Sequence, residues 1–156
     1  MRNLIPLVAL IGCISCSDKL DKRLSQIEED YSISLPNEFE VIQDDDISYN
    51  GFESDYEQIV KLKFDQPEFD SVKVQIEKTA FFNQLHHFEN NSKIGSLPLD
   101  SVHQAIVDSL NIIGQKGTWI EKNSKYKFLF FGDRMDYVNG CLNFNEKTLL
   151  WNHHHL

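Results

Sequence analysis

The sequence predicts an α+β fold, with an antiparallel sheet of about five or six strands and two helices on one face. Two amphipathic helical patterns lie in the middle of the chain, and four strand-like runs closely follow the second. With 156 residues, 41% of them hydrophobic, the chain has the size of one domain with a substantial core. A doubly wound nucleotide-binding fold is disfavoured because the patterns do not alternate around a Gly-rich turn.

The N-terminal segment is typical of an export signal. Arg2 precedes an uncharged apolar run at residues 4–11, which is the layout of a secretory signal peptide. This run is shorter than the roughly 20 apolar residues that a membrane-spanning helix needs. The segment therefore predicts export of the chain.

The end of this segment resembles the lipobox of bacterial lipoproteins. Residues 10–13 read Leu-Ile-Gly-Cys, in which a branched apolar residue and a small residue precede a cysteine. The resemblance implies that residues 1–12 are a signal peptide removed before Cys13, and that the Cys13 thiol carries diacylglycerol. It also implies acylation of the new amino terminus, for example with palmitate. Cys16, which follows a serine, is the alternative lipidation site.

The resemblance also implies a location. A lipoprotein of this kind is exported and lipid-anchored at the bacterial cell envelope, with the outer membrane favoured over the inner one. Its acyl chains exceed the two hydrophobic signals that stable anchoring requires. The first expected partner is therefore a membrane, reached through the N-terminal lipid.

Residues 13–30 are expected to be a lipidated tether, and residues 31–156 a single α+β domain. Apolar side chains recur in the tether at helical spacing, at Leu20, Leu24, Ile27 and Tyr31. The tether could therefore form a short helix that either docks on the domain or stays loosely attached.

Two strands are predicted before the helices. Pro36 marks a boundary, and residues 39–42 have the composition of a short strand. Residues 44–55 are acidic and rich in turn formers, which indicates a connection. Residues 56–64 end in alternating apolar and lysine side chains, as expected of a strand with one buried face.

Two helices are predicted next. Asp65 is placed to cap the first, which carries an apolar stripe at Phe69, Val72, Ile76 and Ala80. The second begins near Asp100 and ends at Gly114, with a stripe at Val102, Ile106, Leu110 and Ile113.

The C-terminal part of the domain is predicted to be a four-stranded antiparallel meander. The runs are close in sequence and separated by short polar turns, at residues 118–121, 125–131, 137–144 and 148–152. His153, His154 and His155 then fall on an expected frayed tail. They could bind Zn²⁺ or Ni²⁺, but a solvated tail is favoured because no carboxylate or cysteine stands beside them in sequence.

Charge and aromatic content narrow the choice of partners. Fifteen basic residues against twenty-four acidic ones give a net charge of −9, which disfavours nucleic acid. The last strands are dense in aromatic residues, and an exposed aromatic patch would bind a basic protein, a peptide or a glycan. The candidate binding residues are Trp119, Tyr126, Phe131, Tyr137 and Trp151. The leading hypothesis is therefore a non-enzymatic binding or accessory module of the cell envelope.

A calcium-binding domain is one alternative. The oxygen-bearing side chains of residues 46–57 have a spacing that resembles the calcium loop of EF-hands, with Gly51 at the sharp turn. The candidate ligands are Asp46, Ser48, Asn50, Ser54 and Glu57. Glu53 departs from the pattern, where the family has an aliphatic residue, and the flanks are predicted to be strands. The same residue types also make ordinary turns. No other cofactor is predicted.

A small hydrolase-like enzyme is the second alternative. Carboxylate pairs such as Asp133 and Asp136 could act as acid and base, and Cys141 could act as a nucleophile. A lone cysteine inside a strand is usually a small buried hydrophobic residue. The sequence contains no nucleophile elbow, zinc-protease motif or phosphate-binding loop, so no catalytic residue is assigned.

Overall fold

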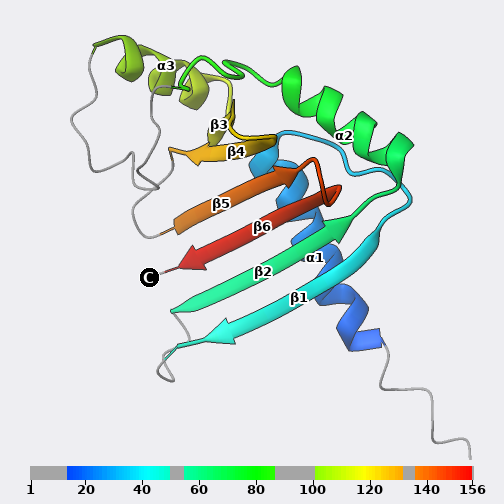
Figure 1. The fold of residues 1–156 in the computed structure, drawn as a ribbon. Coiled ribbons are helices and arrows are strands. Elements are labelled where there is room, and N and C mark those ends of the chain that lie inside the picture. Colours follow the sequence, from blue (N-terminus) through cyan, green and yellow to red (C-terminus); the bar gives the residue numbers. More distant parts are fainter. Residues whose placement is uncertain (1–13, 50–54, 87–100, 132–135, 156) are drawn as a thin grey trace, which may run out of the picture.

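The computed structural model describes residues 14–49, 55–86, 101–131 and 136–155, which form an α+β fold (Figure 1). The helices are α1 (Ile14–Tyr31), α2 (Gln66–Glu77) and α3 (Ser101–Ile112). The strands are β1 (Glu40–Ser48), β2 (Tyr56–Lys63), β3 (Gly117–Glu121), β4 (Lys125–Phe130), β5 (Asp136–Asn143) and β6 (Thr148–His155).

The strands of the described residues form one sheet in the order β1-β2-β6-β5-β4-β3, and every pair of neighbours is antiparallel. The predicted meander is confirmed, because β3, β4, β5 and β6 lie side by side in chain order. The last strand, β6, returns beside β2 and so joins the meander to the N-terminal hairpin of β1 and β2. The predicted fold class is therefore correct.

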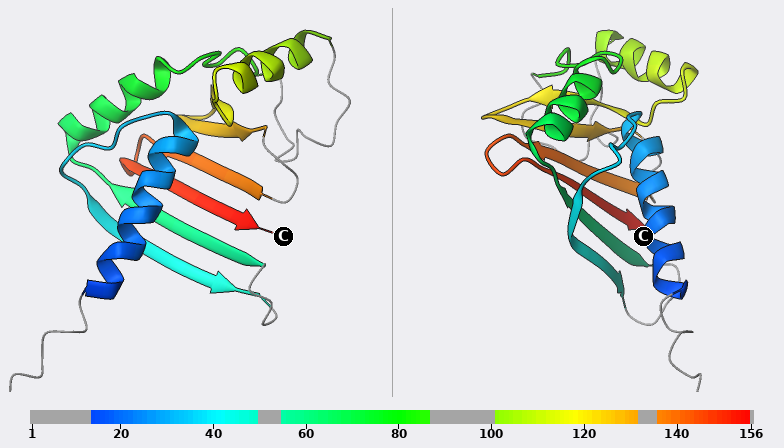
Figure 2. Two further views of the ribbon diagram at one scale, coloured as in Figure 1. Left: turned by 180° about the vertical axis from the view of Figure 1, so that it is seen from behind. Right: turned by 90° about the vertical axis from the view of Figure 1, so that its right-hand side faces the viewer.

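Alternation of side chains along the strands gives the sheet two unlike faces. We call the face that carries Val60, Trp151 and Phe128 the covered face, because α1 and α2 pack on it. These two helices and the sheet enclose one main core. Its fully buried members include Ile27, Val60, Leu62, Val72, Ile76, Trp119, Leu142, Leu149 and Trp151. Figure 2 shows α1 running diagonally across the strands on this side of the sheet.

The close approach of α1 depends on a glycine in the middle of the sheet. The register places Gly140 beside Trp151 on β6 and beside Phe128 on β4, in a row of bulky side chains. The Tyr31 ring occupies the space above Gly140, 4.8 Å from the Trp119 ring and 4.9 Å from the Phe128 ring between centroids. A side chain at position 140 would therefore collide with the Tyr31 and Phe128 side chains.

The third helix packs on the other side of the sheet, which we call the reverse face. Ile106 of α3 contacts a second cluster made by Leu85, Ile120 and Leu129. Ile120 follows Trp119 directly in β3, so its side chain points away from the main core. The two helices that share a face are therefore α1 and α2, whereas the sequence predicted that the two helices on one face are those now seen as α2 and α3.

The expected tether is part of the domain. Ile27 and Tyr31 of α1 are 0% and 1% exposed and belong to the main core. The predicted helical stripe is correct, and of its two open alternatives the structure shows the docked one. The C-terminal half of α1 is thus packed against the sheet as part of the main core.

Two strands are longer than expected because their polar residues are paired along the ladder. β1 includes Asp44, Asp45 and Asp46, which pair with Val60, Ile59 and Gln58 of β2. β6 includes His153–His155, which pair with β2 on one side and with β5 on the other. The prediction of a frayed histidine tail is therefore wrong, because backbone pairing on both sides fixes this segment in the sheet.

The glycine at position 140 gives a direct test of this packing. A Cβ added at Gly140 would lie 2.5 Å from the Tyr31 hydroxyl oxygen and 2.7 Å from the Phe128 Cβ, so α1 or β4 must shift. We expect Gly140→Ala to lower the free energy of unfolding by about 2 kcal/mol, measured by urea denaturation. The control is Cys141→Ala, the next residue on the reverse face, with an expected loss below about 1 kcal/mol. Equal losses for the two variants would contradict this packing.

Candidate functional site

A cleft opens where the C-terminal half of α1 meets the ends of β2, β5 and β6. We call it the α1 cleft. Its volume is about 430 Å³ and it is partly open to solvent. Apolar and titratable side chains both line it: Gln26, Asp30, Tyr56, Lys116, Phe130, Asp136, Val138, His153 and His155.

A buried carboxylate forms one wall of the α1 cleft. Asp30 is 2% exposed and accepts a hydrogen bond from the indole Nε1 of Trp151 at 2.8 Å. Its other oxygen accepts from Lys116 Nζ and from Gln26 Nε2, each at 2.9 Å. Asp30 is therefore a fully partnered anion, and its partners come from α1, from β6 and from the residue before β3.

Lys116 is tied to the same wall. Its Nζ lies 2.9 Å from the carboxylates of both Asp30 and Glu29. Partial burial lowers the pKa of Lys116, but hydrogen bonds and charge attraction from the two carboxylates outweigh this, so its pKa is raised. Lys116 thus stays a cation at neutral pH and carries a positive charge into the cleft.

Two histidines and an aspartate form the opposite wall. His155 Nδ1 lies 2.6 Å from Asp136 Oδ1, and His153 Nε2 lies 3.3 Å from the same oxygen. The hydrogen bond from His155 is the largest cause of the lowered pKa of Asp136. Tyr56 stacks on the His155 ring at 5.4 Å between centroids. Burial and then the charge of Asp136 raise the pKa of Tyr56, so its hydroxyl stays protonated.

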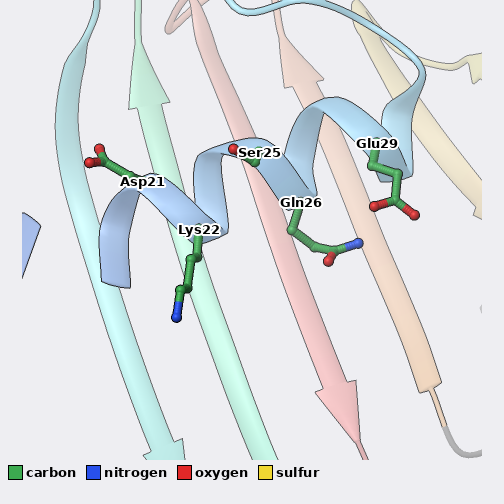
Figure 3. A pocket seen from close by; sticks show the side chains of 5 residues that line it. All are labelled: Asp21, Lys22, Ser25, Gln26 and Glu29. Atoms are coloured by element: carbon green, nitrogen blue, oxygen red, sulfur yellow. The ribbon is translucent and has the colours of Figure 1, made fainter. Parts of the chain in front are cut away.

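A second hollow, of about 470 Å³, lies on the outer side of α1 (Figure 3). All five residues that line it belong to this one helix: Asp21, Lys22, Ser25, Gln26 and Glu29. Figure 3 shows their side chains spread along the helix, with strands of the sheet behind it. The α1 cleft is the better candidate, since several elements converge on it.

The predicted calcium ligands are not brought together among the described residues. Asp46 lies on the covered face, where its carboxylate contacts Arg23 of α1 at 3.4 Å. Glu57 pairs with Ile47, the next residue along β1, and so projects from the reverse face. Ser48 lies at the end of β1, while Asn50 and Ser54 fall outside the described residues. Alternation along the hairpin thus separates the first and last ligands of the expected loop.

The predicted aromatic surface needs correction. Trp119 and Trp151 are 0% exposed and Tyr126 is 3% exposed, so these three rings are parts of the core. Phe131 and Tyr137 are only half-buried. The strands carry aromatic residues on both faces because helices cover both faces of β3 and β4, and burial uses most of this apolar area.

The nucleophile candidate is in an unfavourable setting. Cys141 lies half-buried on the reverse face, and this burial raises the pKa of its thiol. A raised pKa keeps the group as the less reactive thiol at neutral pH. Of the candidate acid pair, Asp133 lies outside the described residues and Asp136 lies in the α1 cleft.

Most of the α1 cleft was missed from the sequence. Among its polar residues, the sequence indicated Asp136 only as half of an acid pair, and it favoured a solvated tail over a metal site for His153 and His155. One signal was available: continuing the alternation of Leu149 and Trp151 along β6 puts both histidines on the same face. No local signal marks Asp30, which acquires its role through Trp151, 121 residues away along the chain.

The Cys16 alternative lies in the first turn of α1, and Cys13 falls outside the described residues. Within the described residues, no helix has the length and hydrophobicity required to span a bilayer. Comparison with protein-family models, with curated proteins and with solved structures gives no match for this chain.

The role of Asp30 can be tested with a matched pair of variants. Asp30→Asn leaves Lys116 and Trp151 without their buried anion, so we expect the free energy of unfolding to fall by about 3 kcal/mol. Glu29→Gln removes the exposed partner of the same lysine and should cost less than about 1 kcal/mol. Adding Lys116→Met to Asp30→Asn should restore part of the loss in urea denaturation. Additive effects of Asp30→Asn and Lys116→Met would contradict the coupling.

Proposed function

We propose that the protein is an exported, lipid-anchored envelope protein whose domain binds a short peptide or glycan segment in the α1 cleft. The observation that carries this proposal is the cleft itself, in which side chains from α1, β2, β5 and β6 converge. Its volume of about 430 Å³ lies within the range of about 300–1,000 Å³ that is usual for ligand sites.

The lining suits a ligand with both apolar and hydrogen-bonding groups. Phe130 and Val138 supply an apolar floor, and Tyr56 supplies a ring with a protonated hydroxyl. Gln26 and Lys116 add donors, which suit the carbonyl groups of a peptide or the hydroxyl groups of a sugar. Few polar groups on an apolar base are typical of specific binding sites.

The position of the cleft agrees with anchoring at the N-terminus. α1 begins at Ile14, next to the predicted lipidation site at Cys13. The helix rises 1.5 Å per residue, so Asp30 lies about 24 Å along its axis from Ile14. A lipid on Cys13 or Cys16 would hold the first turn of α1 at the membrane, and the cleft would lie beside the opposite, C-terminal half of the helix.

The anchor is tested by labelling. We expect the double variant Cys13→Ala, Cys16→Ala to lose palmitate labelling and membrane association, because no acceptor thiol remains at the signal cleavage site. The single variants then assign the modified residue. Cys141→Ala is the control and should label like the wild type, since this residue lies in β5. Palmitate labelling that persists in the double variant would overturn the anchoring proposal.

Ligand binding in the cleft is tested with a variant of α1 whose larger side chain fills the cleft. The probes are oligosaccharides of N-acetylglucosamine and lysine-containing tripeptides, titrated by calorimetry. We expect one probe class to bind, Gln26→Phe to weaken that binding about tenfold by filling the cleft, and Lys22→Phe to leave it unchanged. Lys22 is one turn earlier on the same helix and lines only the outer hollow. Failure of both probe classes to bind, or an equal loss in the two variants, would overturn the proposed ligand site.

A further inference from the structure

Three side chains of the α1 cleft converge on one point from two neighbouring strands. His153 and His155 stand two positions apart in β6, so both rings project from the covered face. The register places Asp136 of β5 directly opposite His155. Both imidazoles contact the same carboxylate oxygen, through His153 Nε2 at 3.3 Å and His155 Nδ1 at 2.6 Å.

We propose that His153, His155 and Asp136 bind a divalent transition-metal ion of the Zn²⁺ or Co²⁺ type. Two imidazole nitrogens and one carboxylate are a ligand set that such ions favour, and it leaves coordination positions open for water or a ligand. All three residues line the α1 cleft, so the open positions face its interior. The inference deepens the proposed function, because the ion would supply one contact to the ligand that the cleft binds.

The donor separations determine how far the side chains must move. Metal–ligand bonds of about 2.1 Å in tetrahedral geometry hold neighbouring donor atoms about 3.4 Å apart. The His153–Asp136 separation of 3.3 Å already matches this value. The His155–Asp136 hydrogen bond of 2.6 Å must lengthen by about 0.8 Å to reach that spacing. Among the described residues no group of three His, Cys, Asp or Glu side chains is already placed to hold an ion, so metal binding here requires this side-chain movement.

Neighbouring aromatic rings limit how far the two histidine side chains can move when they bind an ion. Tyr56 stacks on His155 and meets His153 edge to face at 5.6 Å between centroids. Trp151, two positions before His153 in β6, lies 5.5 Å from the His153 ring between centroids. Both histidine rings thus keep contacts that orient them toward Asp136, which lowers the ordering cost of metal binding.

The proton balance is simple. The ion would bind His155 through Nδ1, which requires the proton of the neutral imidazole to be on Nε2. In the tautomer that carries the proton on Nδ1 and donates to Asp136, that proton would move to Nε2 of the same ring. His153 likewise binds the ion through Nε2 and carries its proton on Nδ1. Metal binding therefore needs no oxidant, reductant or further reactant.

His154 distinguishes this site from general chelation by a histidine run. It projects from the reverse face, where its Nε2 lies 3.4 Å from the Glu57 carboxylate. The sheet backbone separates it from His153 and His155, and it cannot reach the same ion while β6 is paired. The chain thus provides a matched control of the same residue type within the same strand.

The test is a titration of the purified full-length protein with CoCl₂ alone, followed by the visible absorption of the bound ion. We expect one equivalent of Co²⁺ to bind and to be displaced by ZnCl₂. His153→Ala, His155→Ala and Asp136→Asn should each weaken Co²⁺ binding by about tenfold or more. His154→Ala should bind Co²⁺ like the wild type. Circular dichroism of each metal-free variant checks that the fold is intact.

Two results would overturn the metal site. One is the absence of saturable Co²⁺ binding by the folded wild-type protein. The other is an equal loss in His154→Ala and His153→Ala, which is the result expected of an unpaired histidine run. The titration contains no peptide or sugar, so its outcome is independent of the ligand proposed above. Failure of the peptide and sugar probes with intact Co²⁺ binding would reject the proposed function alone.

Discussion

The architecture depends on the docking of the last turn of α1 over a glycine of β5. Gly140 leaves room for the Tyr31 ring between the bulky side chains of Trp151 and Phe128. The Tyr31 hydroxyl lies 2.8 and 2.9 Å from the carbonyl oxygens of Asn139 and Leu150, so it contacts β5 and β6 together. Burial of this one ring therefore fixes the helix relative to two central strands.

The residue before Tyr31, Asp30, forms one wall of the α1 cleft. Asp30 precedes Tyr31 and is directed to the Trp151 indole and to Lys116. Two turns earlier in the helix, Arg23 pairs with Asp44 at 2.7 Å, which attaches the middle of α1 to the edge strand β1. Since the C-terminal half of α1 is held at two points, its inner edge is a fixed boundary of the cleft. A site with one mobile wall would need to order that wall on binding, at a cost in affinity.

The sequence predicted the parts of the fold that follow from local periodicity. The meander, β2 and α2 each have a regular apolar repeat, and α2 begins directly after Asp65, the predicted N-cap residue, whose side chain makes no capping hydrogen bond. The errors in strand length fall on polar residues. Asp44–Asp46 and His153–His155 have low strand preference, yet both segments are strands because they pair with β2 in register. Pairing with a distant strand can outweigh the local preference of a residue, and the single sequence does not show that pairing.

The site was harder to predict for a related reason. The docking of α1 joins Tyr31 to a backbone carbonyl 108 residues further along the chain, and neither partner has a distinctive sequence context. The aromatic residues were visible, but aromatic content alone does not separate a core from a surface. Trp119 and Trp151 are buried because α1 lies over them, which is a property of the fold and not of the strands.

The covered face explains why core and cleft adjoin. Successive cross-strand rows on β2, β6 and β5 change in character toward the open end of the sheet. The row of Val60, Trp151 and Gly140 belongs to the core. The next row is Gln58, His153 and Val138, and the last is Tyr56, His155 and Asp136. Apolar side chains thus give way to polar ones within two rows, beside the last turns of α1. The same alternation that builds the core therefore brings the histidines and Asp136 together, which makes the α1 cleft a continuation of the core surface and not a separate loop site.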